Sequence, residues 1–221
     1  KTKNELNKAL EKEKELNELK SRFVSMASHE FRTPLATIMS SLSLVKAYGE
    51  QNDTEKQSKH IQKIKSSISN LTDILNDFLS VSRLEEGKVE YLPEKFDLVE
   101  FVKEIISETE PLCKNGQVIN YQYSGEKFIE IDKKFLKHVL FNLISNAAKF
   151  SFENSIIQIK SDRLEKEIIL SIEDQGIGIS KSDQKHLFQR FFRGRNASNI
   201  QGTGLGLSII ENYIDMMKGK I

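Results

Sequence analysis

The chain has 221 residues, with 33 basic and 32 acidic side chains and a formal net charge of +1. This length suits one large or two modest domains, and the balanced charge excludes proteins that bind nucleic acid or membranes through a basic excess. No apolar run approaches the roughly 18 residues of a membrane span, and we expect no secretory signal in the charge-rich start. The single cysteine, Cys113, excludes an internal disulfide framework and a multi-cysteine zinc site.

Two apolar stripes at helical spacing dominate residues 24–78. They consist of Val24, Ala27, Phe31, Leu35, Ile38, Leu42 and Val45, and of Ile61, Ile64, Ile68, Leu71, Leu75 and Phe78. The polar turn at residues 49–54, with Asp53 or Thr54 as N-cap, predicts an antiparallel hairpin, and Gly87 lies just past the second helix. Because each stripe is wide enough for more than one neighbour, we expect two hairpins to form a homodimeric four-helix bundle.

Residues 1–20 contain leucines spaced among lysines and glutamates. Opposite charges at helix-pairing separations, such as Glu18 and Arg22, predict a coiled-coil helix that enters from an upstream domain absent from this chain. The alternative is a frayed and solvated end.

From about residue 88 short β-rich runs alternate with helical stretches, which predicts an α+β sandwich with helices on one face. The expected strands are Gln117–Tyr123, Lys127–Ile131, Ser155–Ser161 and Glu167–Glu173, and the expected helices begin at Asp97, span Asp132–Phe150 and Ser180–Phe192, and begin near Gly204. Asp97 and Glu100 form a capping-box pair. We therefore expect three parts, residues 1–20, 21–88 and 89–221.

The first candidate site is the stretch from Ser28 to Leu35. At helical geometry the apolar stripe is centred about 160° away from His29, so the imidazole points to solvent and offers a nucleophilic nitrogen near neutral pH. Glu30 could accept the other ring proton, Thr33 lies one turn further on, and Pro34 should kink the helix. A solvated surface histidine is the alternative, and the lack of a second histidine at Thr33 excludes the zinc-protease motif.

A second candidate is a polar face on the helix predicted over residues 132–150. Asn142, Asn146 and Lys149 share this face, and two carboxamides with an ammonium group suit an Mg²⁺ ion and phosphate oxygens. An ordinary polar helix face is the alternative interpretation.

Two glycine-rich segments add further candidates. Asp174–Gly178 follows a predicted strand, so its glycines let a ligand approach while Asp174 can accept a hydrogen bond from an amino group. Gly202–Ser208 opens a helix and presents free backbone N–H groups to an anion. The spacing matches neither a dinucleotide fingerprint nor a Walker A loop, and plain glycine turns are the alternative.

The segment between these two motifs predicts a lid. Phenylalanines within Phe188–Phe192 would anchor one end of a loop that runs from Arg193 to Gly202. Arg190, Arg193 and Arg195 are available to phosphate, and a basic loop that stays solvated is the alternative.

Taken in order, these motifs resemble the bacterial sensor histidine kinases of two-component signalling. Ser28–Leu35 resembles the phospho-acceptor box, Asn142–Ser151 the asparagine box, Asp174–Gly178 the first glycine box, Phe188–Phe192 the phenylalanine box and Gly202–Leu207 the second glycine box. The resemblance covers the chain from about residue 20 and implies a dimerisation and phosphotransfer hairpin followed by the ATP-binding sandwich also found in DNA gyrase and heat-shock chaperones. The family usually adds strands beyond Ile221, so we expect a C-terminally truncated ATP-binding domain.

The resemblance also implies a mechanism. His29 would attack the γ-phosphorus of ATP with Glu30 as base, and Thr33 would position water in a reverse phosphatase reaction. ATP and Mg²⁺ would be bound by Asn142, Asn146, Lys149, Asp174, Gly176, Gly178, Arg190, Arg193, Gly202, Thr203, Gly204, Leu205 and Gly206, with the metal on Asn146 and Asn142 and adenine read by Asp174. The phosphoryl group would then pass to an aspartate of a response-regulator receiver domain.

Two other functions remain open at this point. One is an ATP-binding scaffold that no longer transfers phosphate, and the other is an ATP-driven clamp of the gyrase or chaperone type; the helical half could also serve dimerisation alone. The expected location is the cytoplasm. Anchoring of a full-length protein in the inner membrane stays open, because any spanning helix would precede Lys1.

Overall fold

The computed structural model describes residues 2–164, 167–197, 200 and 202–221. The chain forms two compact units, one made of Lys1–Ser82 with Ile200–Leu205 and the other of Arg83–Asn199 with Gly206–Ile221. No helix among the described residues is long and apolar enough to cross a membrane.

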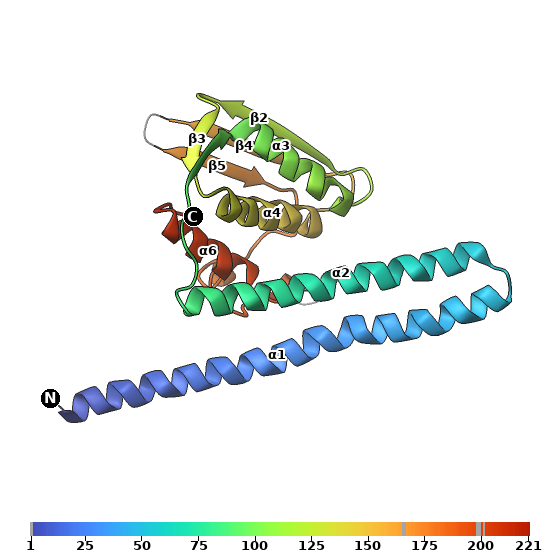
Figure 1. Ribbon diagram of the computed structural model, residues 1–221, viewed down its shortest axis with the longest axis horizontal. Helices are drawn as coiled ribbons and strands as arrows, with labels where there is room; N and C mark the ends of the chain where they lie inside the picture. The colour runs from blue at the N-terminus through green and yellow to red at the C-terminus, as the bar shows by residue number, and fades with distance from the viewer. Residues whose placement is uncertain (1, 165–166, 198–199, 201) are drawn as a thin grey trace. The chain divides into compact units, whose positions relative to one another are not determined.

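The first unit is a helical hairpin of α1 (Thr2–Glu50) and α2 (Thr54–Glu85), as predicted (Figure 1). Asp53 caps α2, because its Oδ1 atom accepts the backbone N–H of Lys56 at 3.1 Å. At the other end Gly87 adopts a left-handed φ of 62°, which lets the N–H groups of residues 87 and 88 return to the carbonyls of residues 84 and 83. Both helix boundaries therefore follow from local chemistry that the sequence predicted.

Helix α1 continues without interruption through Pro34. Proline lacks the N–H group that would bond to the carbonyl of residue 30, so one backbone hydrogen bond is missing beside His29. Residues 2–20 belong to the same helix, and its role as a helix that enters from an upstream domain stays a prediction. The predicted kink stays a prediction.

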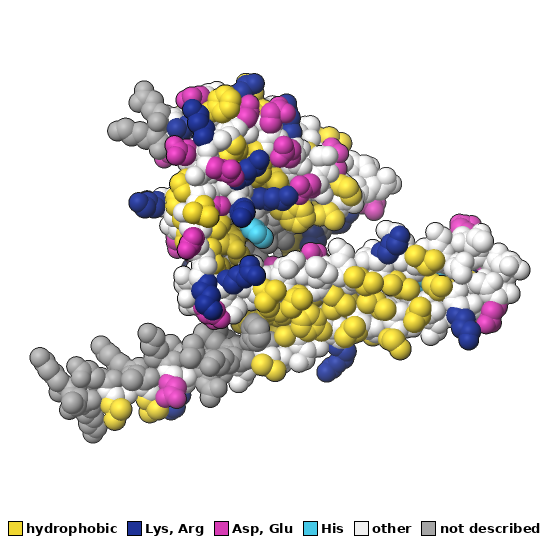
Figure 2. All heavy atoms as spheres, viewed as in Figure 1, with side chains coloured by type: hydrophobic (Ala, Val, Ile, Leu, Met, Phe, Trp, Pro, Cys, Tyr) yellow, Lys and Arg dark blue, Asp and Glu magenta, His cyan; other side chains and the backbone are white. Residues whose placement is uncertain are grey.

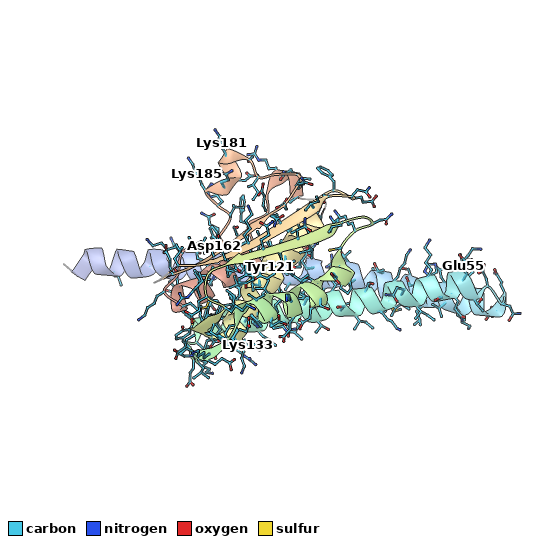
Figure 3. All side chains as sticks on the ribbon, turned by 90° about the horizontal axis from the view of Figure 1, so that it is seen from above. Glu55, Tyr121, Lys133, Asp162, Lys181 and Lys185 are labelled. Atoms are coloured by element: carbon cyan, nitrogen blue, oxygen red, sulfur yellow. The ribbon has the colours of Figure 1, made fainter. Side chains whose placement is uncertain are left out.

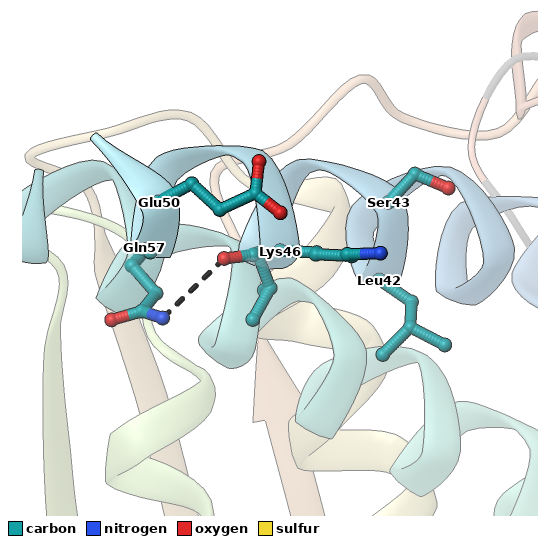
Figure 4. Close-up of a pocket in the computed structure, with 7 residues that line it drawn as sticks. Leu42, Ser43, Lys46, Glu50 and Gln57 are labelled. Carbon is teal, nitrogen blue, oxygen red and sulfur yellow. Dashed lines mark hydrogen bonds between the residues drawn. The ribbon is translucent and has the colours of Figure 1, made fainter. Parts of the chain in front are cut away.

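The two helices pack through only part of their apolar surface. The rings of Phe31 and Phe78 meet edge to face with centroids 6.0 Å apart, and Ile74 and Val81 are buried beside them. Near the hairpin tip, Gln57 donates to the carbonyl of Val45 at 3.3 Å beside a shallow hollow between the helices (Figure 4).

A second set of apolar side chains on the hairpin stays exposed. Figure 2 shows hydrophobic side chains gathered along both helices, and these exposed residues include Leu35, Met39, Leu42, Ile61, Ile68, Leu75 and Leu79. Each helix therefore carries more apolar surface than its partner in the hairpin covers.

The second unit is an α/β sandwich, again as predicted. In chain order it contains β1 (Glu94–Asp97), α3 (Leu98–Thr109), a 3₁₀ turn (Glu110–Leu112), β2 (Val118–Ser124), β3 (Phe128–Ile131), α4 (Lys133–Phe150), β4 (Ile156–Arg163), β5 (Ile168–Glu173), α5 (Lys181–Gln184), a second 3₁₀ turn (Arg195–Ala197) and α6 (Gly206–Met216). Strands β2, β4 and β5 form one sheet, in which β2 and β4 are parallel, whereas β1 and β3 pair antiparallel. Helices α3 and α4 cover one face of the sheet, and α6 packs on α4 (Figure 1).

The core of this unit lies between the sheet and helices α3 and α4. Leu140 and Ile144 of α4 are fully buried against Ile157 and Ile159 of β4. Polar groups at its margin find partners: the Tyr121 hydroxyl lies 2.7 Å from that of Ser161, and the Lys133 ammonium lies over the Phe96 and Phe101 rings (both Tyr121 and Lys133 are labelled in Figure 3).

Two elements differ from the sequence prediction. Strand β1 was not predicted. The helix predicted over Ser180–Phe192 was wrong in length, because α5 ends at Gln184 and turns follow. The physical reason is that Phe191 has a left-handed φ of 65° and that the Asp183 carboxylate accepts the N–H of Arg195, 12 residues further along the chain.

Aspartates cap both long helices of the sandwich. Asp97 Oδ1 accepts the N–H groups of Val99 and Glu100, which confirms the predicted N-cap, while the Glu100 side chain pairs with Lys103. Asp132 is buried, and its Oδ1 accepts from residues 134 and 135 of α4 while Oδ2 accepts the N–H of Leu92 at 2.8 Å. This carboxylate therefore joins the start of α4 to the segment that leads into β1.

Replacing Asp132 with Ala should destabilise the α/β unit by about 2 kcal/mol, since it removes a helix cap and leaves the Leu92 N–H without its acceptor. Guanidinium unfolding followed by circular dichroism measures this change. Asp215→Ala, at an exposed position, is the matched control. Equal stability of the two variants would contradict a capping role.

Candidate functional site

His29 is presented outward from α1. Its side chain is 74% exposed, whereas that of its neighbour Glu30 is 5% exposed, and the His29 Nδ1 atom lies 3.4 Å from Glu30 Oε1. When Nδ1 carries the proton and donates to the carboxylate, Nε2 keeps its lone pair and points away from Glu30. The predicted exposure of His29 is confirmed. Thr33, one turn further on, is also exposed.

Helix α4 brings the predicted asparagines together. Asn146 Nδ2 donates to Asn142 Oδ1 at 2.8 Å, so the two carboxamides lie side by side on the half-buried polar face of the helix. This hydrogen bond directs the Nδ2 atom of Asn146 toward Asn142, so the Oδ1 atom of Asn146 points away from Asn142. Lys149 lies one turn further along, with its ammonium group 5.4 Å from the Phe150 ring centroid.

The first residue of α6 closes one side of this face. A Cβ atom on Gly206 would lie 2.4 Å from Asn142 Nδ2, so a larger residue here would displace the Asn142 side chain. The N-terminal end of α6 therefore lies beside Asn142, which is the juxtaposition expected of an anion site at a helix N-terminus.

The loop Asp174–Gly178 packs on the other end of α4. The Ile177 N–H donates to the Phe150 carbonyl at 3.2 Å, and a Cβ on Gly176 would lie 2.5 Å from the same oxygen. Asp174 is exposed, and its Oδ1 accepts a long 3.5 Å hydrogen bond from the Ser151 hydroxyl. Gly178 adopts a left-handed φ of 65°. The first glycine segment and the asparagine face thus share one helix as their support.

Other predicted phosphate ligands are engaged elsewhere. Arg190 forms an ion pair with Glu85 at the end of α2, and Arg193 donates to the Ala197 carbonyl at 3.1 Å. Within the hairpin unit, Thr203 donates to Asp77 of α2 at 2.8 Å and accepts the N–H of Leu205. In the structure each of these three side chains therefore has a protein partner.

Gly202, Gly204 and Leu205 belong to the same unit as Thr203. Gly204 has a left-handed φ of 68°, which favours glycine, and Leu205 is fully buried. Part of the predicted lid, residues 198–199 and 201, lies outside the described residues.

Two polar residues that sequence reasoning missed organise the described part of the lid. Asn196 donates to the carbonyls of Ile177 and Gly178, at 3.2 and 2.9 Å, and so ties the lid to the first glycine segment. Asp183 is buried and accepts the Arg195 N–H at 3.3 Å. Neither contact has a sequence signal, because each joins residues 12 or more positions apart in an irregular segment.

The donor set suits a hard cation that arrives with its own phosphate ligands. Carboxamide oxygens are acceptable Mg²⁺ ligands, and Mg²⁺ usually takes one or two protein ligands together with waters and substrate phosphates. Among the described residues no three His, Cys, Asp or Glu side chains gather into a metal site. The side-chain carbonyl oxygens of Asn142 and Asn146 are ligands of the kind that fits a nucleotide-bound Mg²⁺ ion.

His138 lies one turn before Asn142 on α4. Its ring is 5.5 Å from that of Tyr213 on α6. Burial, and secondly the charge of Lys137, hold the pKa of His138 below the usual histidine value. A neutral His138 therefore fits the contact between α4 and α6.

Two family models match the chain in order. Residues 19–87 match the "His Kinase A (phospho-acceptor) domain", and residues 131–221 match the "Histidine kinase-, DNA gyrase B-, and HSP90-like ATPase". His29 lies within the first match, and the asparagines, both glycine segments and α6 lie within the second.

Two known sensor kinases are similar to nearly the whole chain. An uncharacterized sensor-like histidine kinase, ycf26, of Pyropia yezoensis is 32% identical over 226 residues, which cover 95% of this chain and 34% of that protein. The autoinducer 2 sensor kinase/phosphatase LuxQ of Vibrio cholerae is 32% identical over 212 residues, covering 92% of this chain and 24% of LuxQ. The chain thus spans about a third or less of these relatives.

A solved structure supports the same fold. Full-length ShkA in complex with AMPPNP superposes with a TM-score of 0.61 at 25% sequence identity, covering 86% of this chain and 40% of ShkA.

Protonation of His138 should make the protein less stable at acidic pH. Because its pKa is lowered on folding, the unfolded chain binds the proton more tightly, so stability falls as pH drops below the unfolded value of about 6.5. His138→Gln should lose less stability than the native chain over this window, as measured by thermal unfolding at several pH values. An identical pH dependence would show that His138 titrates normally.

Proposed function

The chain belongs to the sensor histidine kinases, and we propose that it transfers the γ-phosphoryl group of ATP to its own His29. The observation that carries the proposal is the contrast at residues 29 and 30. An exposed imidazole lies 3.4 Å from a buried carboxylate that can bias its tautomer, and both residues lie within the match to the phospho-acceptor domain. A solvated surface histidine would need no such neighbour.

The proposed reaction is an in-line displacement. His29 Nε2 forms a bond to the γ-phosphorus while the bond to the β–γ bridging oxygen breaks, and ADP leaves. Glu30 takes the proton from Nδ1, so the ring does not accumulate positive charge. Since phosphoryl transfer requires mainly positioning and charge neutralisation, an exposed nucleophile on one unit can serve a nucleotide held by another.

The second unit supplies the nucleotide site in this proposal. Asp174 accepts the adenine amino group, the backbone N–H groups at the start of α6 and the Lys149 ammonium face phosphate oxygens, and Asn146 with Asn142 holds the metal. Mg²⁺ would neutralise charge on the phosphates when bound. Support comes from the position of Asn142, Asn146 and Lys149 on α4, from the close approach of Gly206 to Asn142, and from the AMPPNP named in the ShkA complex.

Onward transfer to a response-regulator aspartate completes the proposed function. The name of LuxQ includes both kinase and phosphatase. By analogy we assign to Thr33, exposed one turn from His29, the positioning of water in a reverse reaction. Arg190, Arg193 and Thr203 would have to leave their present partners before they could contact phosphate.

A homodimer is part of the same proposal. The exposed apolar residues of the hairpin form a continuous strip at i, i+4 and i+7 spacing, as in Leu35, Met39 and Leu42. A second copy of the hairpin would cover this strip and make a four-helix bundle.

Incubation with γ-labelled ATP and Mg²⁺ tests the kinase. The native chain should acquire an acid-labile, base-stable label, His29→Ala should lose it completely, and Asn146→Ala should lose most of it because the metal is no longer held. His60→Ala is the matched control, since His60 lies in the same hairpin. ATP binding without any label would instead favour a phosphotransfer-deficient scaffold or an ATP-driven clamp.

Charge introduced into the exposed strip tests the dimer. Met39, whose surface is 66% exposed in the single chain, should become buried in a dimer, so Met39→Glu should give a monomer. Light scattering after gel filtration measures the mass, with Ser40→Glu, at an exposed position on another face of the same helix, as the control. A native chain that is already monomeric at micromolar concentration would exclude the bundle.

A further inference from the structure

The last carbonyl groups of α4 are capped by side chains from a distant segment. Lys114 Nζ donates to the carbonyls of Lys149 and Ser151, at 2.8 and 2.6 Å. Gln117 Nε2 donates to those of Ala148 and Phe152, at 3.0 Å each. The carbonyls of Ala148 and Lys149 lie in the last turn of α4, where intrahelical partners run out, and those of Ser151 and Phe152 directly follow the helix, so two side chains supply hydrogen bonds to both places.

The two capping residues form a rigid turn of their own. Gln117 Oε1 accepts the backbone N–H of Lys114 at 2.7 Å, and the Gln117 N–H returns to the Lys114 carbonyl at 3.1 Å. The turn is also tied to the segment after α4, because Asn154 donates to the Asn115 carbonyl and Val118 donates to that of Ser155. Lys114 is therefore held where its ammonium group reaches the helix end.

The capped carbonyls lie directly beneath the proposed adenine site. Phe150, between the two carbonyls that Lys114 binds, accepts the N–H of Ile177, and Ser151 forms a bridge with Gly176 and a hydrogen bond to Asp174. The Gly176 backbone fits so closely against Phe150 that no Cβ could be placed there. A shift in the backbone of residues 149–152 would therefore move Asp174.

We propose that Lys114 is a positioning residue for nucleotide recognition, which sets the position of Asp174 through the C-terminal end of α4. The inference rests on the proposed function, since it takes Asp174 as the group that reads the adenine amino group. A cation suits this place for a second reason: it complements the partial negative charge at the helix C-terminus, which a neutral donor such as Gln117 does less well.

The inference predicts a change in base selectivity. Inosine triphosphate carries a carbonyl oxygen where ATP carries the amino group, so a correctly placed Asp174 carboxylate should favour ATP. Lys114→Met removes the cation while keeping the length of the side chain, and it should weaken ATP binding about tenfold, or about 1.4 kcal/mol, with little effect on the inosine nucleotide. Lys114→Arg, which keeps the charge and the donors, should restore most of the selectivity.

The measurement is calorimetric titration of the full 221-residue chain with each nucleotide and Mg²⁺. Lys160→Met, at an exposed position of β4, is the matched control and should bind as the native chain does. Thermal unfolding without nucleotide accompanies each variant. A Lys114→Met protein that binds both nucleotides with native affinity but at reduced stoichiometry would show a purely structural role and overturn the inference.

Asp174→Asn separates this inference from the proposed function. If Asp174→Asn loses the preference for ATP while Lys114→Met keeps it, adenine is read as proposed but Lys114 does not position the reader. If Asp174→Asn also keeps the preference, the assignment of Asp174 in the proposed function is wrong, and the inference falls with it. Loss of preference in both variants, with rescue by Lys114→Arg, supports both.

Discussion

Helix α4 is the element on which the nucleotide-binding unit depends. Its buried face, which includes Leu140 and Ile144, packs into the core between α3 and the sheet, and this packing fixes the rotation of the helix. With that rotation fixed, Asn142 and Asn146 must lie on the opposite, polar side. The same helix meets α6 through Gly206 and the adenine loop through its last carbonyls. The packing of α4 on the core therefore positions the two asparagines, the start of α6 and the adenine loop relative to one another.

Features with a local cause could be predicted from the sequence. The hairpin helices are examples. The hydrogen bonds that cap helices at Asp53, Gly87 and Asp97 join residues at most five positions apart, so the local sequence predicts them. The shared face of Asn142 and Asn146 likewise follows from helical periodicity. The exposure of His29 followed from its angle to the apolar stripe. In each case the geometry of a few neighbouring residues determines the local structure, and tertiary contacts do not change it.

Features that depend on distant partners could not be predicted. Lys114 caps α4 through residues 35 and 37 positions away, and no residue type or spacing marks such a pair. Strand β1 has only four residues, and it exists because β3 offers a ladder, not because its sequence alternates. The predicted helix after Ser180 failed for the same reason, since the Asp183 carboxylate and the left-handed Phe191 reverse the chain. Tertiary hydrogen bonds outweighed local propensity there.

The contrast between His29 and Glu30 has a consequence for how one histidine can serve two reactions. In the proposed function an exposed ring must be oriented, because phosphoryl transfer depends on alignment, yet it must also remain accessible to a nucleotide and then to a receiver aspartate. Glu30 is anchored by its burial in the hairpin and so carries the rigidity of the helix to the imidazole. The 3.4 Å separation is long for a hydrogen bond, so it biases the tautomer while it leaves the ring free to turn. A shorter contact between His29 and Glu30 would hold the imidazole more firmly in one orientation. That orientation would suit either the nucleotide or the receiver aspartate better than the other.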